Sequence, residues 1–296
     1  MFESCRAHFV VRLFAIAVLL VAAGAAAAAI ELDKGGRANG LRVVRFDLTS
    51  GLFHRKLAEE AIVPSGSERR PLLVFLHGRQ DLNSSTSEFA SARGPDTMAS
   101  PSFRAAVAAL GNRAPVVLFA NGGGHSYFHD RRDGKWASMV LREAIPDAIK
   151  RFHVEPNRVA IGGISMGGYG AVLIAGLDPK RFCAVGGHSA AVWTSGEVSA
   201  PGAFDDAQDF DRNDVLKLAA AGRYRGLPVW LDVGTRDPFR DTDTKLAATL
   251  RASGVRVSFH IWPGAHAASY WHRHEAAYLR FYAAAFSRCP AVSGGR

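Results

Sequence analysis

Ser165 is the residue of this sequence best suited to act as a nucleophile. It lies at the centre of a G-x-S-x-G motif at residues 163–167, between the apolar run 159–161 and a helical pattern that begins at residue 168. A strand, a sharp turn and a helix in this order are the setting of a nucleophile elbow, where glycines allow strand and helix to approach closely. The alternative is a glycine-rich turn with an idle serine.

Asp237 is the acid that best fits a serine nucleophile in this setting. A serine hydroxyl needs a base to take its proton, and the base needs an acid to orient it. The acid follows the serine in the chain order of this architecture, and Asp237 lies just beyond the apolar run 229–233. Asp232 lies inside that run, whereas Asp241 and Asp243 lie in the first turn of a predicted helix, where capping explains them.

His266 is the predicted base among the 11 histidines of the chain. It follows the last predicted strand and precedes the last predicted helix, which is where the third member of the order serine, acid, histidine has to come from. His260 lies within that strand, and His272 and His274 lie inside the helix, where surface or packing roles explain them. The sequence therefore predicts a catalytic triad of Ser165, Asp237 and His266.

Metal and cofactor chemistry have little support in the sequence. His125 and His129 stand four positions apart, a spacing that suits a metal, but no third ligand is spaced with them. The chain has neither a phosphate loop that ends in Gly-Lys-Ser/Thr nor a dinucleotide-binding fingerprint. We therefore expect no metal and no cofactor.

Apolar runs and helical patterns alternate along the chain. Strands are predicted at residues 41–48, 59–63, 72–76, 116–120, 159–161, 183–185, 229–233 and 255–261, and helices at residues 103–110, 136–152, 168–177, 241–252 and 267–286. This alternation predicts an α/β fold with a mostly parallel central sheet flanked by helices. Ligands of such sheets bind beyond the carboxyl ends of the strands, where the three triad candidates lie.

The basic charge of the chain is dispersed rather than clustered. The sequence has 296 residues, 48% of them hydrophobic, enough to bury one core of enzyme size. Its formal net charge is +9, from 36 Lys+Arg and 27 Asp+Glu, yet no run of five or more like charges occurs. Acids stand beside the arginines at residues 68–70 and 130–133. We therefore expect no nucleic-acid partner, because nucleic-acid binding needs clustered cations.

Residues 1–29 have the pattern of a signal peptide. Arg6 and Arg12 precede an uncharged stretch, residues 13–30, that ends in small residues suited to cleavage near Ala29. We expect residues 30–296 to form a single exported domain, secreted or periplasmic, with no stable membrane span after cleavage. The alternative is an uncleaved anchor, because the 18 residues from 13 to 30 just reach spanning length.

Cys183 and Cys289 remain in the exported domain, because Cys5 would leave with the signal peptide. Two thiols in an oxidising compartment can form a disulfide. Cys183 opens a predicted strand and Cys289 ends the final predicted helix, so both can lie at one edge of the sheet. The alternative is a pair of buried free thiols.

The motifs occur together in an order that resembles one family. They are Leu76-His77-Gly78, residues 136–146, residues 161–171, Asp232-Val233-Gly234 with Asp237, and Trp262-Pro263-Gly264 with His266 and Trp271. Together they resemble the esterase family of α/β-hydrolases that includes esterase D (S-formylglutathione hydrolase), feruloyl esterase modules and the antigen 85 mycolyltransferases. The resemblance spans roughly residues 72–286 and implies an α/β-hydrolase fold and a serine hydrolase or acyltransferase.

The resemblance also implies which groups surround the nucleophile. The backbone N–H groups of Met166 and Arg79 would form the oxyanion hole, and His77 and Tyr127 would lie on the substrate side. The loop at residues 122–129 matches the family's substrate-side loop in position but not in composition. The antigen 85 enzymes have an aspartate at the position of His77, so their kind of sugar recognition is not implied.

These inferences predict an exported serine esterase that hydrolyses carboxylic esters through an acyl-enzyme. The expected substrates are small-molecule, carbohydrate or lipid esters. The nearest alternative is an acyltransferase that moves the acyl group to a sugar or another alcohol, because its first half-reaction is the same. A further alternative is a non-catalytic envelope protein that uses the hydrolase fold to bind, because a fold does not determine a function.

Overall fold

The computed structural model describes residues 40–79 and 98–289. The chain divides into two units, residues 1–35 and 36–296, and every described residue belongs to the second unit. The predicted signal peptide, residues 1–29, lies outside the described residues, so its cleavage and the domain boundary at residue 30 stay predictions. Over the described part of the chain, none of the helices combines the length and the apolar composition that crossing a bilayer requires.

One mixed, mostly parallel sheet forms the centre of the described fold. Its strands are β1 (Leu41–Ser50), β2 (Arg55–Pro64), β3 (Leu72–Leu76), β4 (Val116–Phe119), β7 (Val159–Ile164), β8 (Val185–His188), β9 (Val229–Gly234) and β10 (Val257–Trp262). The strand order is β1-β2-β4-β3-β7-β8-β9-β10. β2 pairs antiparallel with β1 and β4, and every later pair is parallel, so β3 and β7–β10 end at one edge.

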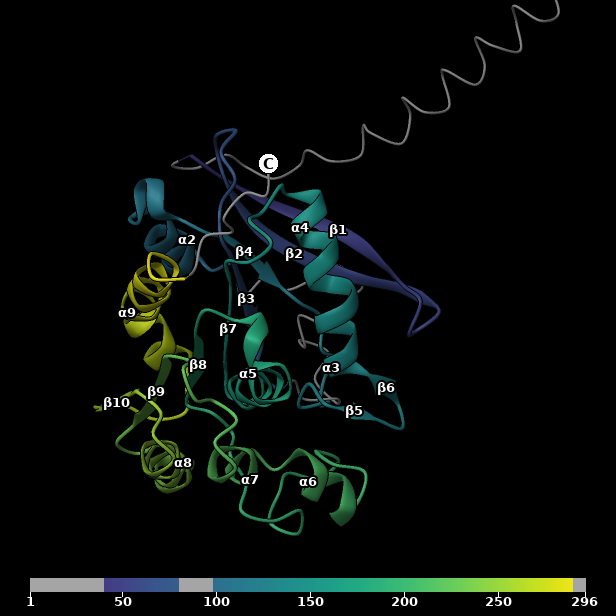
Figure 1. Ribbon diagram of the computed structural model, residues 1–296, viewed down its shortest axis with the longest axis vertical. Helices are drawn as coiled ribbons and strands as arrows, with labels where there is room; N and C mark the ends of the chain where they lie inside the picture. Colours follow the sequence, from purple (N-terminus) through teal and green to yellow (C-terminus); the bar gives the residue numbers. More distant parts are fainter. Residues whose placement is uncertain (1–39, 80–97, 290–296) are drawn as a thin grey trace, which may run out of the picture. The chain divides into compact units, whose positions relative to one another are not determined.

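Helices cover both faces of this sheet (Figure 1). They are α2 (Pro101–Ala108), α3 (Trp136–Met139), α4 (Ile145–Arg151), α5 (Met166–Leu177), α6 (Ala207–Asn213), α7 (Val215–Ala220), α8 (Arg240–Ala252) and α9 (Ala268–Phe286). α2 and α9 pack on one face, whereas α3, α4, α5, α7 and α8 pack on the other. The short strands β5 (Asp130–Arg131) and β6 (Gly134–Lys135) form a separate hairpin. The predicted α/β fold is confirmed.

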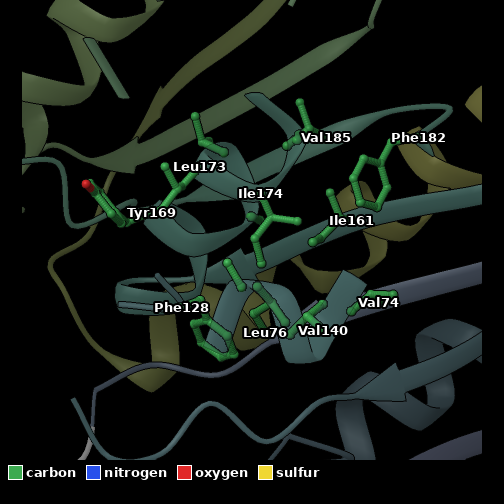
Figure 2. Close-up of a cluster of buried hydrophobic side chains, with 14 of the residues drawn as sticks. Val74, Leu76, Phe128, Val140, Ile161, Tyr169, Leu173, Ile174, Phe182 and Val185 are labelled. Atoms are coloured by element: carbon green, nitrogen blue, oxygen red, sulfur yellow. The ribbon is translucent and has the colours of Figure 1, made fainter. Parts of the chain in front are cut away.

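The central strands are apolar throughout because each face of the sheet packs against a different core. In β3, Leu72, Val74 and Leu76 contact the cluster around α5, and the alternate residues Leu73 and Phe75 contact the cluster around α9. Figure 2 shows part of the α5-side cluster, in which the side chains of α5 lie over those of β3 and β7. Burial on both faces explains why the short runs lack hydrophobic–polar alternation.

The structure differs from the predicted elements in a few segments. The predicted helix at residues 136–152 is interrupted by a π-helical turn, η2 (Val140–Ala144), because Pro146 lacks the N–H that a regular turn requires. The strand predicted at residues 183–185 begins only at Val185. α6 and α7 were not predicted, because helices this short show little apolar periodicity. Asp206 and Asp214 cap these two helices, and an aspartate is a typical residue at a helix start, so these residues could have indicated both helices.

A disulfide joins Cys183 to Cys289, with 5.5 Å between their Cα atoms. Cys183 lies just before β8, and its backbone N–H donates a hydrogen bond to the Val159 carbonyl at the start of β7 (2.7 Å). Cys289 follows the end of α9. The bond therefore fastens the last helix to the amino-terminal edge of the parallel strands, opposite the edge where the triad candidates lie.

We predict that the variant Cys183→Ala/Cys289→Ala loses about 2–5 kcal/mol of unfolding free energy, because the disulfide closes a loop between residues 106 positions apart. Urea unfolding in oxidising buffer measures the loss. As a control, a reducing agent should lower the stability of the wild type to that of the variant and leave the variant unchanged. Equal stability of the oxidised wild type and the variant would contradict the prediction.

Candidate active site

Ser165 occupies the sharp turn between β7 and α5. Its backbone has φ 54° and ψ −118°, a strained conformation for a residue with a side chain. Its N–H donates to the His188 carbonyl (3.0 Å), and its carbonyl accepts from the N–H of Tyr169 and of Ala191 (both 3.0 Å). These bonds hold the strained turn between the end of β8 and the first turn of α5.

The glycines beside Ser165 permit a backbone contact that no side chain would allow. A Cβ atom at Gly167 would lie 2.2 Å from the Leu76 carbonyl oxygen, and one at Gly163 would lie 2.7 Å from the same oxygen. Both distances are far below van der Waals contact. The motif is thus explained by the close packing of β3, β7 and α5 around the nucleophile.

His266 hydrogen-bonds both Ser165 and Asp237. Its Nε2 lies 2.8 Å from Ser165 Oγ, and its Nδ1 lies 2.9 Å from Asp237 Oδ2. Because a carboxylate only accepts, Nδ1 carries the proton and Nε2 is able to accept the proton of the hydroxyl. The other carboxylate oxygen of Asp237 accepts the N–H of Phe239 (2.9 Å), and the Asp237 side chain is fully buried.

The loops that carry Asp237 and His266 are bonded to each other. The N–H of Thr235 donates to the Trp262 carbonyl (2.8 Å), and the N–H of Arg236 donates to the Gly264 carbonyl (2.9 Å). A Cβ atom at Gly234 would lie 2.7 Å from the Gly264 oxygen, so glycine is required where the loops meet. The parallel strands β9 and β10 therefore end in a single backbone unit that holds acid and base together.

Two aromatic rings enclose the imidazole of His266. Phe239 packs edge-on against it with 5.2 Å between ring centroids, and Trp271 does so with 5.0 Å. The histidine side chain remains 23% exposed, so its Nε2 edge stays reachable. Neither ring was predicted to flank the base, although Trp271 belongs to the motif that follows His266 and Phe239 stands two residues after Asp237.

The two residues whose backbone N–H groups are the predicted oxyanion donors adjoin Ser165 either in the chain or through a neighbour. Met166 follows the nucleophile at the start of α5, and Arg79 follows Gly78, where a Cβ atom would lie 3.6 Å from Ser165 Cβ. Within residues 40–79 and 98–289, neither N–H donates to another group. Orphan donors at a helix start can stabilise a developing negative charge.

His77 lies behind the loop that carries Arg79 rather than on an open surface. Its side chain is 2% exposed. Its Nδ1 donates to the Gly78 carbonyl (2.8 Å), and its Nε2 accepts the N–H of Gly122 (3.1 Å). Burial lowers the pKa of His77 to about 4, so the ring is neutral at pH 7. The residue expected on the substrate side therefore links two backbone loops.

Tyr127 belongs to the loop at residues 122–129, lies close to the Arg79 guanidinium and is almost completely buried. Burial raises the pKa of its hydroxyl, whereas the guanidinium of Arg79 and the indole of Trp193 act in the opposite direction. Trp193 was not predicted to border the site, because no motif surrounds it in the sequence. Its position follows from the segment after Ala191, whose N–H bonds to the Ser165 carbonyl.

Asp232 connects the strands beneath the triad to the last helix. Its buried carboxylate accepts hydrogen bonds from His188 Nδ1 (2.6 Å), Trp230 Nε1 (2.8 Å) and the hydroxyls of Tyr270 and Tyr278 (both 2.9 Å). These donors come from β8, β9 and α9, elements that adjoin the turn or loop of each triad residue. Asp232 thus holds structural elements together, whereas the acid that contacts His266 is Asp237.

The two histidines with metal-like spacing pair with separate carboxylates. His129 lies 2.8 Å from Asp209 in a buried pair, and His125 lies 3.6 Å from Asp133. Over the described residues, no group of three or more His, Cys, Asp and Glu side chains is arranged to hold a metal ion. The buried pair of His129 and Asp209 instead attaches the substrate-side loop to α6.

Comparison with known proteins also indicates an esterase. Residues 64–279 match the family described as Putative esterase. No curated protein sequence matches the chain significantly. Among solved structures, a ferulic acid esterase is similar with a TM-score of 0.69 and 21% identity, over 83% of this chain and 98% of that one.

Two further structures share the fold. The S-formylglutathione hydrolase of Agrobacterium tumefaciens has a TM-score of 0.69 and 17% identity, over 87% of this chain and 100% of that one. MPT51 of Mycobacterium tuberculosis has a TM-score of 0.60 and 16% identity, over 81% of this chain and 97% of that one. Because the family match extends over well more than half of the chain, the protein belongs to this esterase family of α/β-hydrolases and is an enzyme of the serine hydrolase class.

Proposed function

We propose that the protein is an exported esterase that cleaves carboxylic esters through an acyl-enzyme on Ser165. The hydrogen-bonded line from Ser165 through His266 to Asp237 carries this proposal. It supplies a nucleophile, a base with a free lone pair and an acid that holds the base in the required tautomer. The substrates we propose are small-molecule, carbohydrate or lipid esters, and the reaction needs no cofactor.

Acylation uses the groups in the order of their hydrogen bonds. Ser165 Oγ attacks the ester carbonyl while its proton passes to His266 Nε2, and Asp237 stabilises the imidazolium that forms. The N–H groups of Met166 and Arg79 donate to the tetrahedral oxyanion, and each such donor typically contributes about 3 kcal/mol. The intermediate then expels the alkoxide, which takes the proton from His266, and the acyl group stays on Ser165.

Deacylation repeats these steps with water as the nucleophile. His266 takes a proton from the water as its oxygen attacks the acyl carbonyl, and the same two N–H groups hold the second oxyanion. Collapse of this intermediate breaks the bond to Ser165 Oγ, which regains its proton from His266. The products are a carboxylic acid and the alcohol released earlier.

Export to a secreted or periplasmic location is part of the proposal. The charge and apolar pattern of residues 1–29 supports it. The disulfide between Cys183 and Cys289 also supports it, because such bonds persist in oxidising compartments and are rare in the cytosol.

The proposed oxyanion hole depends on a neutral His77. The Gly122 N–H donates to His77 Nε2, and protonation of that nitrogen would replace an acceptor by a second donor. Two donors would then oppose each other in a buried space, and the loop before Arg79 would lose a support. Acid should therefore loosen the loop that places one of the two oxyanion donors.

We predict that a fluorophosphonate labels the wild type on Ser165 and that Ser165→Ala removes the label, because the attacking oxygen is gone. Asp237→Asn should keep the fold and lower kcat about ten-thousand-fold, because the wrong tautomer of His266 is then favoured. Ser253→Ala, which changes a serine at the far end of α8, should label as the wild type does. Labelling is measured by intact-protein mass. A folded wild type that takes no label would contradict an enzyme and favour a binding protein.

The fate of the acyl group separates hydrolysis from transfer. We predict that 4-nitrophenyl butyrate gives free butyrate as the main acyl product even with glycerol or trehalose present, because water completes the proposed cycle. Mass spectrometry of the products measures the ratio of acid to new ester. Predominant formation of a glyceryl or trehalose ester would contradict hydrolysis and favour the acyltransferase.

We predict that the wild type loses stability as the pH falls from about 6.5 to about 4, with a contribution of about 3 kcal/mol from His77. In this window the unfolded chain binds a proton at His77 and the folded chain does not, so stability rises with pH and is fully present above 6.5. His77→Asn should show a smaller acid-dependent loss, measured by urea unfolding at several pH values. The exposed His54→Asn is the control and should follow the wild type. Equal pH slopes for all three proteins would refute the assignment to His77.

A further inference from the structure

Arg79 places a positive charge close to the nucleophile. Gly78, its neighbour, packs against Ser165, since a Cβ atom at Gly78 would lie 3.6 Å from Ser165 Cβ. The backbone N–H of Arg79 belongs to the proposed oxyanion hole. The side chain of Arg79 therefore starts one residue away from a direct contact with the nucleophile.

Among the described residues, the hydrogen-bond acceptor of the Arg79 guanidinium is a carbonyl oxygen and not an acid. Its Nη2 donates a hydrogen bond to the Pro201 carbonyl (2.7 Å). Among residues 40–79 and 98–289, no Asp or Glu oxygen lies within 4.0 Å of an Arg79 nitrogen. A guanidinium has five N–H donors in a planar fork, so donors remain for a ligand.

The Tyr127 hydroxyl connects the Arg79 guanidinium to a second donor, the indole of Trp193. It lies close to both groups, and both oppose the rise of its pKa that burial causes. The Trp193 Nε1–H has no hydrogen-bond acceptor in the described part of the chain. Trp193 packs edge-on against Phe239 with 5.0 Å between ring centroids, and Phe239 packs against His266. A chain of contacts therefore runs from Arg79 through Tyr127, Trp193 and Phe239 to His266, and it consists of hydrogen-bond donors and aromatic rings.

The ionisable groups near Arg79 do not neutralise its positive charge. Burial lowers the pKa of His125, and the charges of Arg131 and Arg79 lower it further against the opposing effect of Asp133. Asp133 itself lies 3.6 Å from His125 and 3.5 Å from Arg131. The Asp133 carboxylate thus already has cationic and histidine neighbours, and it forms no ion pair with Arg79.

We propose that the site takes esters that carry a carboxylate a few bonds from the scissile carbonyl, and that the Arg79 guanidinium binds this carboxylate. The inference rests on the proposed function, because it names the substrate class of that same site. A guanidinium fork binds a planar carboxylate through two parallel hydrogen bonds. A partly desolvated cation that, like Arg79, has no carboxylate partner among the described residues gains most from such a ligand. The Arg79 side chain is then a specificity determinant, whereas its backbone N–H serves neutral and anionic esters alike.

Two pairs of esters test the inference. On the acyl side, 4-nitrophenyl hemiglutarate carries a carboxylate that 4-nitrophenyl pentanoate lacks. On the alcohol side, the butyrate of 4-hydroxybenzoate carries one that the butyrate of methyl 4-hydroxybenzoate lacks. For each pair, the ratio of kcat/KM for the anionic to the neutral ester is measured after subtraction of spontaneous hydrolysis. Within a pair, the comparison between variants cancels the intrinsic reactivity of the esters.

We expect Arg79→Gln to lower this ratio about tenfold for at least one pair, mainly through a higher KM for the anionic ester. Arg79→Lys should keep part of the preference, because it keeps the charge. Higher ionic strength should lower the ratio of the wild type. Arg256→Gln removes the same charge from an exposed position just before β10, at the opposite edge of the sheet, and should leave both ratios unchanged.

The outcomes separate this inference from the proposed function. If Arg79→Gln still turns over both members of each pair with the ratios of the wild type, the inference is overturned and the esterase stands. A wild-type ratio that ionic strength does not change would also overturn it, without reliance on a variant. If the folded wild type hydrolyses none of the four esters and takes no fluorophosphonate label, the proposed function fails instead.

Discussion

The two hydrogen bonds of His266 are the interaction on which the rest of the site depends. They measure 2.8 Å to Ser165 and 2.9 Å to Asp237, and they join positions 101 and 29 residues away along the chain. A hydrogen bond weakens steeply once its distance or angle departs from these values. The ends of β7, β9 and β10 must therefore keep their relative positions to within a few tenths of an ångström. Parallel pairing brings those ends to one edge but does not supply that precision.

Two kinds of contact supply the precision. Close backbone contacts at Gly163, Gly167 and Gly234 leave no space for the strand ends to shift, because even a methyl group would overlap a carbonyl oxygen. The buried carboxylate of Asp232 adds directional bonds between β8, β9 and α9. The glycines set how closely the elements approach, and Asp232 sets how they are aligned. Removing one donor would leave the buried charge undercompensated, so the network favours a single arrangement.

The sequence could predict the triad positions because chain order reflects topology in a parallel α/β sheet. Ser165 directly follows β7, and Asp237 and His266 lie in the short loops that follow β9 and β10. Apolar runs mark these strands without knowledge of their neighbours. The place of His77 could not be predicted in the same way, since its partner Gly122 lies 45 positions away. The buried pair of His129 with Asp209 likewise depends on a tertiary contact that no local pattern encodes.

The role of a charged residue is equally hard to predict from the sequence, because the effect of an arginine depends on its partners in the fold. Arg131 is nearly buried, and its guanidinium is satisfied by Asp205 and by the carbonyl oxygens of His125, Gly202 and Ala203, so its charge stabilises the fold. Arg79 carries the same charge, but no carboxylate of the described residues lies against it. In the sequence, an acid directly precedes Arg131 and a glycine directly precedes Arg79, and each arginine has an aspartate two positions on. A net charge of +9 counts both equally, although the substrate-binding role we propose belongs to Arg79 and not to Arg131.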